Sequence, residues 1–160
     1  MHNSVVCNCL RMTALDQMVC FSLYSASRAT TQAYRRLLER WGLTYPQYLV
    51  LVELWTQGPR SVRQLGDDLA LDSGTLSPLL RRMETAGIVT RSRDQADGRV
   101  VTVDLTAHGR ELRTEMADVP AQVAQCMSLT VESARELLDA LHRLTGSVQA
   151  SNSDAAAVAS

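Results

Sequence analysis

Cys20 is the residue of this chain whose type and surroundings best suit redox chemistry. A thiolate that reacts with a peroxide needs hydrogen-bond donors, and tyrosine hydroxyls supply them without placing a charge in an apolar pocket. Tyr24 follows Cys20 at i+4 on one face of a predicted helix, and the positive end of that helix favours a thiolate weakly. Tyr34 lies 14 residues on, about 21 Å along a straight helix. Tyr34 therefore cannot reach Cys20 within one chain.

Cys20 and Tyr24 also have plain structural roles open to them. A single cysteine on an apolar helix face is more often an inert buried side chain than a sensor, and Tyr24 taken alone is most simply a core residue. Residue types and spacing by themselves leave both roles open.

Three further cysteines lie outside this group. Cys126, near the end of a predicted helix, is either a second reactive thiol or a small buried side chain. Cys7 and Cys9 are two residues apart, but the three histidines are scattered and complete no metal-ligating cluster. We expect no metal site and no cofactor. A chain of 160 residues buries about two-thirds of its unfolded surface, so it needs no disulfide to fold.

The elements that must position these side chains begin with two helices. A capping-box spacing at Thr13 and Asp16 predicts a helix over residues 13–41, and Pro46 in a first turn starts the next helix. Residues 1–12 show no hydrophobic period, so we expect a mobile N-terminal arm there.

In the middle of the chain, the hydrophobic pattern predicts two short helices and then a pair of strands. Ser61 caps a short helix, and Asp72 or Ser73 caps a second one after a three-residue turn. Residues 88–93 and 99–105 are then rich in β-branched side chains and flank a glycine-containing turn, which predicts a β-hairpin.

The C-terminal part is predicted to be helical again. One helix runs from Thr106 towards Cys126 and is interrupted near Pro120, and another covers residues 130–146. Residues 147–160 are small and polar without a period, which predicts a disordered tail.

Two short helices followed at once by a hairpin are the layout of a winged helix-turn-helix, so the fold class is mainly α with a small β-hairpin wing. The second short helix would enter the major groove of DNA. Its first turns carry short hydrogen-bonding side chains, Ser73, Thr75 and Ser77, and Arg81 and Arg82 follow for phosphate or guanine contacts. The alternative is an ordinary solvated helix face.

The hairpin tip adds a second predicted contact to DNA. Arg99 would enter the adjacent minor groove, with Asp97 holding its guanidinium in place. The net charge is only -1, yet residues 28–113 hold 13 Arg against 10 acidic residues, and the remainder holds 3 Arg against 7. This segregation places a nucleic-acid surface in the middle of the chain.

Hydropathy predicts no membrane partner, because no apolar run approaches the ~20 residues of a membrane span. The N-terminus lacks the pattern of a secretory signal peptide, which is a basic start followed by an apolar stretch and a cleavage site. We therefore expect a cytoplasmic protein, in which cysteines stay reduced unless oxidation is their task.

Three segments resemble the MarR family of winged-helix repressors, over about residues 15–144. Leu71–Glu84 carries the general family pattern, whereas Cys20–Arg28 and Leu43–Tyr48 are similar to the subgroup of organic hydroperoxide resistance regulators. The resemblance implies that Tyr34 and Tyr45 bond to the sensing cysteine of the partner chain. It also implies that Cys126 is a resolving cysteine in the opposite subunit.

The resemblance further implies a homodimer on a pseudo-palindromic DNA operator, and a regulator rather than an enzyme. We expect a single domain over residues 13–146, with dimerisation helices at about 13–41 and 106–146 and a DNA-binding region at about 45–105. The dimer layer is expected to contain the leucines of the first and last helices, Leu37, Leu38, Leu137, Leu138, Leu141 and Leu144.

The sequence therefore predicts a repressor that releases its operator when an organic hydroperoxide oxidises Cys20. A second hypothesis is a MarR-type repressor released by a phenolic or other small ligand, with Cys20 merely lining the pocket. A thiol peroxidase ranks lower, because the chain has neither an Arg or Thr beside Cys20 in a peroxidase-like motif nor a βαβ pattern.

Overall fold

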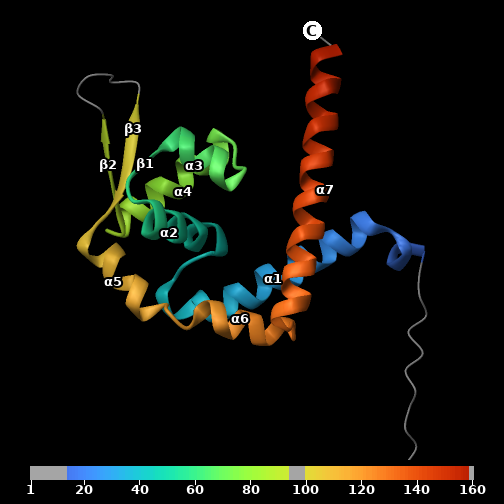
Figure 1. Ribbon diagram of the computed structural model, residues 1–160. Coiled ribbons are helices and arrows are strands. Elements are labelled where there is room, and N and C mark those ends of the chain that lie inside the picture. The colour runs from blue at the N-terminus through green and yellow to red at the C-terminus, as the bar shows by residue number, and fades with distance from the viewer. Residues whose placement is uncertain (1–13, 94–99, 159–160) are drawn as a thin grey trace, which may run out of the picture. The chain divides into compact units, whose positions relative to one another are not determined.

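The computed structural model describes residues 14–93 and 100–158 (Figure 1). Two compact units divide the chain, residues 1–119 and residues 120–160. The predicted N-terminal arm, residues 1–12, and the predicted hairpin-tip contacts Asp97 and Arg99 lie outside the described residues.

The first unit begins with a helix whose two ends are wound more tightly. Helix α1 (Val19–Leu38) is preceded by the 3₁₀ turn η1 (Ala14–Gln17) and followed by η2 (Glu39–Trp41). The chain then reverses at Gly42, where φ is +64°, a conformation that glycine adopts without steric cost. The sequence predicted one helix over residues 13–41, and the structure replaces its ends with 3₁₀ turns, which bond terminal backbone groups left without α-helical partners.

Three short helices follow, and each begins at a polar cap. In α2 (Tyr45–Gln57) the cap is Thr44, in α3 (Val62–Leu69) it is Ser61, and in α4 (Ser73–Thr85) it is Asp72. The Ser61 and Asp72 side chains accept from backbone N–H groups that have no partner inside the helix, whereas the Thr44 N–H and hydroxyl both donate to Oε1 of Gln47. The tight link between α3 and α4 needs a left-handed residue, Ala70, with φ of 52°. The predicted helix-turn-helix is confirmed.

A three-stranded antiparallel sheet completes the winged helix. Strands β2 (Val89–Arg93) and β3 (Val101–Leu105) form the predicted hairpin, with Val89 opposite Leu105. The sequence analysis missed β1 (Arg60–Ser61), which pairs with β3 and makes the strand order β1-β3-β2. Two residues are too few to show strand alternation. The predicted fold class, mainly α with a small β wing, is confirmed.

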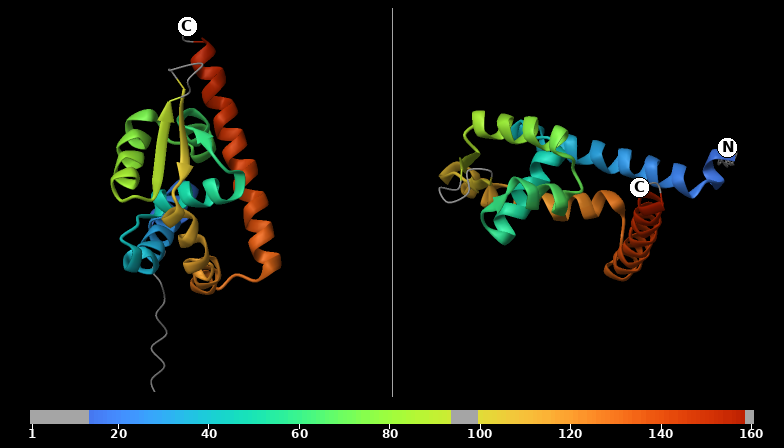
Figure 2. Two further views of the ribbon diagram at one scale, coloured as in Figure 1. Left: turned by 90° about the vertical axis from the view of Figure 1, so that its left-hand side faces the viewer. Right: turned by 90° about the horizontal axis from the view of Figure 1, so that it is seen from above.

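The core of the first unit lies where α2, α3 and α4 pack against this sheet (Figure 2). Its side chains are almost wholly aliphatic, as expected for a small domain stabilised by apolar burial. Fully or nearly fully buried members are Leu51, Leu54, Leu65, Leu76, Leu80, Met83, Val89, Val103 and Leu112. Leu38 is also fully buried within its own chain. The expectation that Leu38 belongs to a dimer layer is therefore wrong, because its own chain leaves none of this side chain exposed to a partner.

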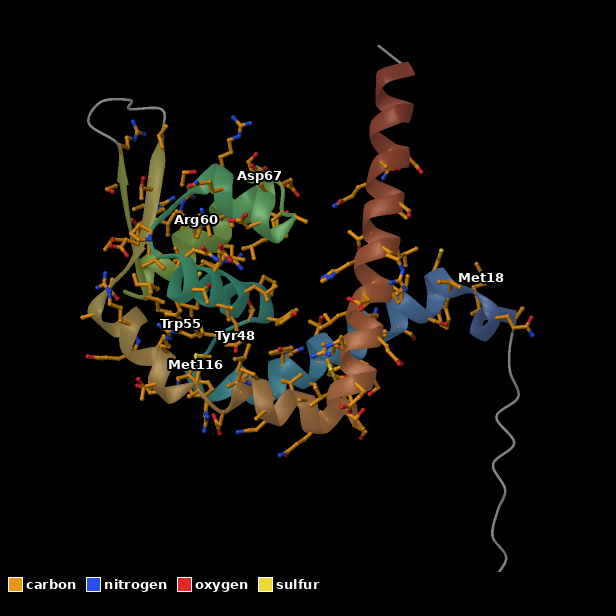
Figure 3. The ribbon with its side chains drawn as sticks, in the orientation of Figure 1. Met18, Tyr48, Trp55, Arg60, Asp67 and Met116 are labelled. Carbon is orange, nitrogen blue, oxygen red and sulfur yellow. The ribbon has the colours of Figure 1, made fainter. Side chains whose placement is uncertain are left out.

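Helix α5 (Ala107–Glu115) follows the sheet directly. Thr106 caps it by accepting a hydrogen bond from the Gly109 N–H, and its hydroxyl donates to the carbonyl of Gly87 at 2.6 Å. The indole N–H of Trp55 donates to the Gly109 carbonyl at 2.8 Å, which fastens α2 to α5. Figure 3 places Trp55 on α2 beside α5.

The second unit contains most of α6 (Val119–Met127) and all of α7 (Val131–Val158). The helix α7 is longer than predicted and includes residues 147–158. The predicted disordered tail is thus wrong for these residues. Alanine at positions 155–157 has the highest helix propensity of the amino acids, and the Ser151 hydroxyl bonds to the Ser147 carbonyl one turn earlier.

Gly109 marks a close approach between α5 and the sheet. A Cβ at this position would overlap the Ile88 carbonyl oxygen and lie 3.1 Å from Leu105 Cδ2. We expect Gly109→Ala to lower the free energy of unfolding by about 1–3 kcal/mol, as measured by urea denaturation. Gly146→Ala is the matched control, since a Cβ there meets nothing within 4 Å and alanine favours a helix. Equal stability of the two variants would contradict this packing.

Candidate functional site

Cys20 lies in the first turn of α1 and is exposed. The sequence predicted a helix from residue 13, whereas α1 begins only at Val19 because η1 precedes it. No side chain caps this N-terminus. The backbone N–H groups of the first turn therefore favour a negative charge close to the thiol.

Tyr24 stands one turn after Cys20 and is 56% exposed. The interpretation of Tyr24 as a core residue is therefore wrong for the isolated chain. Its hydroxyl accepts a hydrogen bond of 2.8 Å from Nη1 of Arg28, another turn along the helix. The Arg28 guanidinium carbon lies 5.6 Å from the centroid of the Tyr24 ring.

The tyrosines predicted to serve the thiol, Tyr34 and Tyr45, lie together. Their ring centroids are 4.2 Å apart in a stacked arrangement, although Tyr34 comes from α1 and Tyr45 from α2. Tyr48, which the site prediction left out, joins them with its centroid 5.6 Å from that of Tyr34. The spacing of Tyr45 and Tyr48, one turn apart on the same helix face, was the signal that could have identified it.

These phenols keep their protons at neutral pH. Burial, with a smaller contribution from the neighbouring Tyr45 and Tyr48, raises the pKa of Tyr34 to about 12. Burial also raises the pKa of Tyr45 and of Tyr48 above the ordinary value of 10.0. Each hydroxyl therefore has a hydrogen to donate to an anion such as a thiolate.

Cys20 and Tyr34 of one chain are kept apart by α1 itself. Both lie on this one continuous helix, and a rise of 1.5 Å per residue separates them by roughly 21 Å. The structure thus brings Tyr34 and Tyr45 together but does not bring Cys20 to them.

A hollow of about 660 Å³ opens beside the tyrosine pair, between α1 and the start of α2. Tyr45 and Pro46 line it on one side, and α1 contributes Thr31, Arg35 and Arg36 on the other. Its lining combines apolar surface with these two cationic side chains and the carboxylate of Glu39. A small organic molecule could enter such a hollow next to the Tyr45 ring.

Cys126 belongs to the second unit, where it lies near the end of α6 and is exposed. In the isolated chain, this exposure does not fit the alternative of a small buried side chain. An exposed thiol is open to exchange chemistry.

The start of α4 presents its polar side chains outward. Ser73 and Thr75 are exposed, and Ser77 is partly buried. Thr75 donates both its backbone N–H and its hydroxyl to the Asp72 carboxylate, each at 2.9 Å. These bonds from Thr75 lower the pKa of Asp72. The Thr75 hydroxyl therefore remains available to DNA as an acceptor.

The two arginines of the predicted groove helix, Arg81 and Arg82, are exposed. The structure thus brings all five predicted α4 residues onto one short helix and leaves the two cations accessible to a polyanion.

An ion pair that the sequence analysis did not identify joins α4 to the wing. Nε and Nη2 of Arg91 on β2 donate to Oε2 of Glu84 at 2.9 and 2.6 Å. This hydrogen bond and the charge of Arg91 lower the pKa of Glu84. The two residues are seven positions apart across a turn, so no helical or strand period indicated the pair.

The described ranges 14–93 and 100–158 contain no group of three or more His, Cys, Asp or Glu placed to hold a metal ion. Within the same ranges, no helix is both long and apolar enough to cross a membrane.

Comparison with known proteins matches much of the chain to transcriptional regulators. A family model described as transcriptional regulator SarA/Rot matches residues 32–116. The HTH-type transcriptional regulator TtmR of Methylorubrum extorquens (strain PA1) is 47% identical over 128 residues, which are 80% of this chain and 66% of that protein. The organic hydroperoxide resistance transcriptional regulator of Bacillus subtilis (strain 168) is 38% identical over 138 residues, 86% of this chain and 94% of that protein.

Solved structures of AbfR from Staphylococcus epidermidis are similar in fold. Reduced AbfR bound to DNA is 33% identical with a TM-score of 0.70, covering 81% of this chain and 90% of that one. Disulfide-formed AbfR is 35% identical with a TM-score of 0.58, covering 81% of this chain and 86% of that one.

The Glu84–Arg91 pair gives a testable dependence on pH. A lowered carboxylate pKa means that the pair stabilises the folded state above the unfolded pKa of Glu84 and that this contribution is lost as the pH falls through the lowered value. We expect Glu84→Gln to lower Tm at pH 7 by no more than about 4 °C, since the pair is partly exposed. The difference from the wild-type protein should shrink towards pH 3 in a calorimetric series, and a constant difference would contradict the ion-pair origin.

Proposed function

Because the chain belongs to the MarR-like winged-helix family of DNA-binding transcriptional regulators described as SarA/Rot, we propose that it is a homodimeric repressor whose DNA binding is switched by Cys20. The reduced dimer holds a pseudo-palindromic operator in the cytoplasm, and oxidation of Cys20 by an organic hydroperoxide releases it. We assign residues 45–105 to DNA binding, and the helices over 13–41 and 106–146 to dimerisation.

The observation that carries this proposal is the tyrosine pair. Tyr34 and Tyr45 form a stacked, protonated pair beside a hollow, and the length of α1 keeps Cys20 of the same chain away from this pair. In a dimer, Cys20 of the partner chain supplies the thiolate. Two hydroxyl donors then stabilise the negative charge on sulfur before it reacts.

The chemical step is a two-electron oxidation of sulfur. The Cys20 thiolate attacks the terminal oxygen of the hydroperoxide, the O–O bond breaks, and the alkoxide takes a proton and leaves as an alcohol. Cys20 is left as a sulfenic acid. Condensation with the thiol of Cys126 from the other subunit then forms a disulfide and releases water. The exposure of Cys126 supports this second step.

Exposed apolar side chains support the dimer. They lie near the start of α1 and along the C-terminal helices, and a monomer would leave all of them in water. They are Leu15, Met18, Val19, Met127, Leu129, Val131, Leu137, Leu138, Leu144 and Val148. A two-fold DNA site also requires a two-fold protein.

A second candidate function is supported by the hollow beside Tyr45. Its volume of about 660 Å³ suits a phenolic or other small ligand whose binding would release DNA without oxidation. In that case the intact mass of the released protein stays unchanged, whereas the redox mechanism adds oxygen or removes two hydrogens.

We expect Cys20→Ser to abolish release by hydroperoxide. In a gel-shift titration, cumene hydroperoxide should weaken operator binding by wild-type protein about tenfold or more, which corresponds to about 1.4 kcal/mol between reduced and oxidised forms. The Cys20→Ser variant should stay bound. The matched control, Cys126→Ser, should still release but form no intersubunit disulfide on a non-reducing gel. Equal release of wild-type and Cys20→Ser protein would contradict the sensing role.

We expect Arg82→Ala to weaken binding to all DNA sequences because it removes a phosphate contact. A plot of the logarithm of the DNA-binding constant against the logarithm of the salt concentration should become shallower by about 1 for each subunit contact that is lost. Arg113→Ala is the matched control, an exposed arginine on α5 outside the proposed DNA surface. An unchanged salt slope for Arg82→Ala would exclude it from the phosphate contacts.

A further inference from the structure

Cys20, Tyr24 and Arg28 occupy positions i, i+4 and i+8 of α1 and so form one stripe along the helix. Arg28 is the only charged residue of the sequence between Val19 and Tyr34. The stripe therefore consists of a thiol, a phenol and a single cation in that order.

The hydrogen bond between the last two residues restricts where the Tyr24 proton can go. A guanidinium has donors but no acceptor, so in the 2.8 Å contact Arg28 donates and the Tyr24 oxygen accepts. The phenol keeps its own O–H, which must point away from the cation. Its donor is also strengthened, because a hydroxyl that accepts a bond from a cation donates more strongly.

Arg28 lies one turn C-terminal to Tyr24 and Cys20 one turn N-terminal to it, so an O–H turned away from the cation faces the start of α1. Among the described residues of the isolated chain, the side-chain hydrogen bond of Tyr24 is the one to Arg28. Long side chains of a helix lean towards its N-terminus and cover the preceding turn. The turn preceding Tyr24 is the one that carries Cys20. The N-terminal lean also places Arg28 over Tyr24, which is the contact observed.

The charge of Arg28 acts weakly on the thiol without this intermediary. Two helical turns separate the two residues by roughly 12 Å, whereas the screening length in physiological salt is about 8 Å. Any strong influence of Arg28 on Cys20 therefore passes through the Tyr24 hydroxyl.

We propose that Arg28 is a positioning residue for the sensing step: it holds the Tyr24 hydroxyl so that its proton is donated to the Cys20 thiolate. This inference rests on the proposed function, in which Cys20 reacts with an organic hydroperoxide. Tyr24 of the same chain then adds a donor to the two tyrosines supplied by the partner chain.

The test measures the rate of Cys20 oxidation in the full-length protein. Purified dimer is mixed with cumene hydroperoxide, the reaction is quenched at set times with a sulfenic acid trap, and the fraction of modified Cys20 peptide is determined by mass spectrometry. The variants are Arg28→Met, Arg28→Lys, Tyr24→Phe and the double variant of Arg28→Met with Tyr24→Phe. The control is Arg113→Met on α5.

Loss of one hydrogen bond to an anion should slow the second-order rate constant by roughly 3- to 10-fold in both Arg28→Met and Tyr24→Phe. The double variant should be no slower than Tyr24→Phe, because Arg28 acts only through that hydroxyl. Arg28→Lys should restore part of the rate, since an ammonium also donates to the phenol oxygen. Arg113→Met should react at the wild-type rate.

Two results would overturn the positioning role of Arg28. One is a wild-type rate in Arg28→Met together with a lower Tm, which would make the pair a helix-stabilising contact only. The other is a double variant whose rate constant is reduced by the product of the two single reductions. Failure of the proposed function has a different signature, because Cys20 of the wild-type protein would then stay unmodified, and this result would also end the inference.

Discussion

The rigidity of α1 is the constraint on which the rest of the candidate site depends. The helix runs without a break from Val19 to Leu38, and its fixed rise places Cys20 and Tyr34 of the same chain about 21 Å apart along the helix axis. Cys20 and Tyr34 of one chain therefore cannot meet, and under the proposed function a complete site needs a second chain. In that proposal sensing requires the dimer, because each chain would supply the thiolate of one site and the tyrosine donors of the other.

The donor pair is joined to the DNA-binding core by aromatic contacts. Tyr48 lies between Tyr34 and Trp55, with its ring centroid 6.1 Å from that of Trp55 in an edge-on arrangement. The Trp55 indole bonds in turn to Gly109, where α5 meets the sheet. Contiguous packing of this kind is the physical requirement for coupling two distant sites. Under the proposed function, a shift of Tyr34 on oxidation would displace Tyr48, which is buried on α2 and contacts Trp55.

Local signals explain why most elements could be predicted. Ser61, Asp72 and Thr106 cap their helices as the sequence indicated, because a cap needs only a polar side chain and a backbone N–H three residues on. Prediction failed where the partner is distant or the signal is short. β1 exists because Arg60 pairs with Val103, and the extended α7 exists because alanine sustains a helix even without an apolar period.

The sequence by itself determined the helix-turn-helix with its hairpin, the polar and cationic residues of α4, and the impossibility of an intrachain contact between Cys20 and Tyr34. All of these follow from local periodicity and from the rise of a helix. Only the tertiary structure decided that Tyr34 and Tyr45 stack, that Arg91 pairs with Glu84, and that Leu38 is buried in its own chain. Each of these depends on how separate elements pack against one another. Contacts between residues of different elements leave no periodic pattern in the sequence.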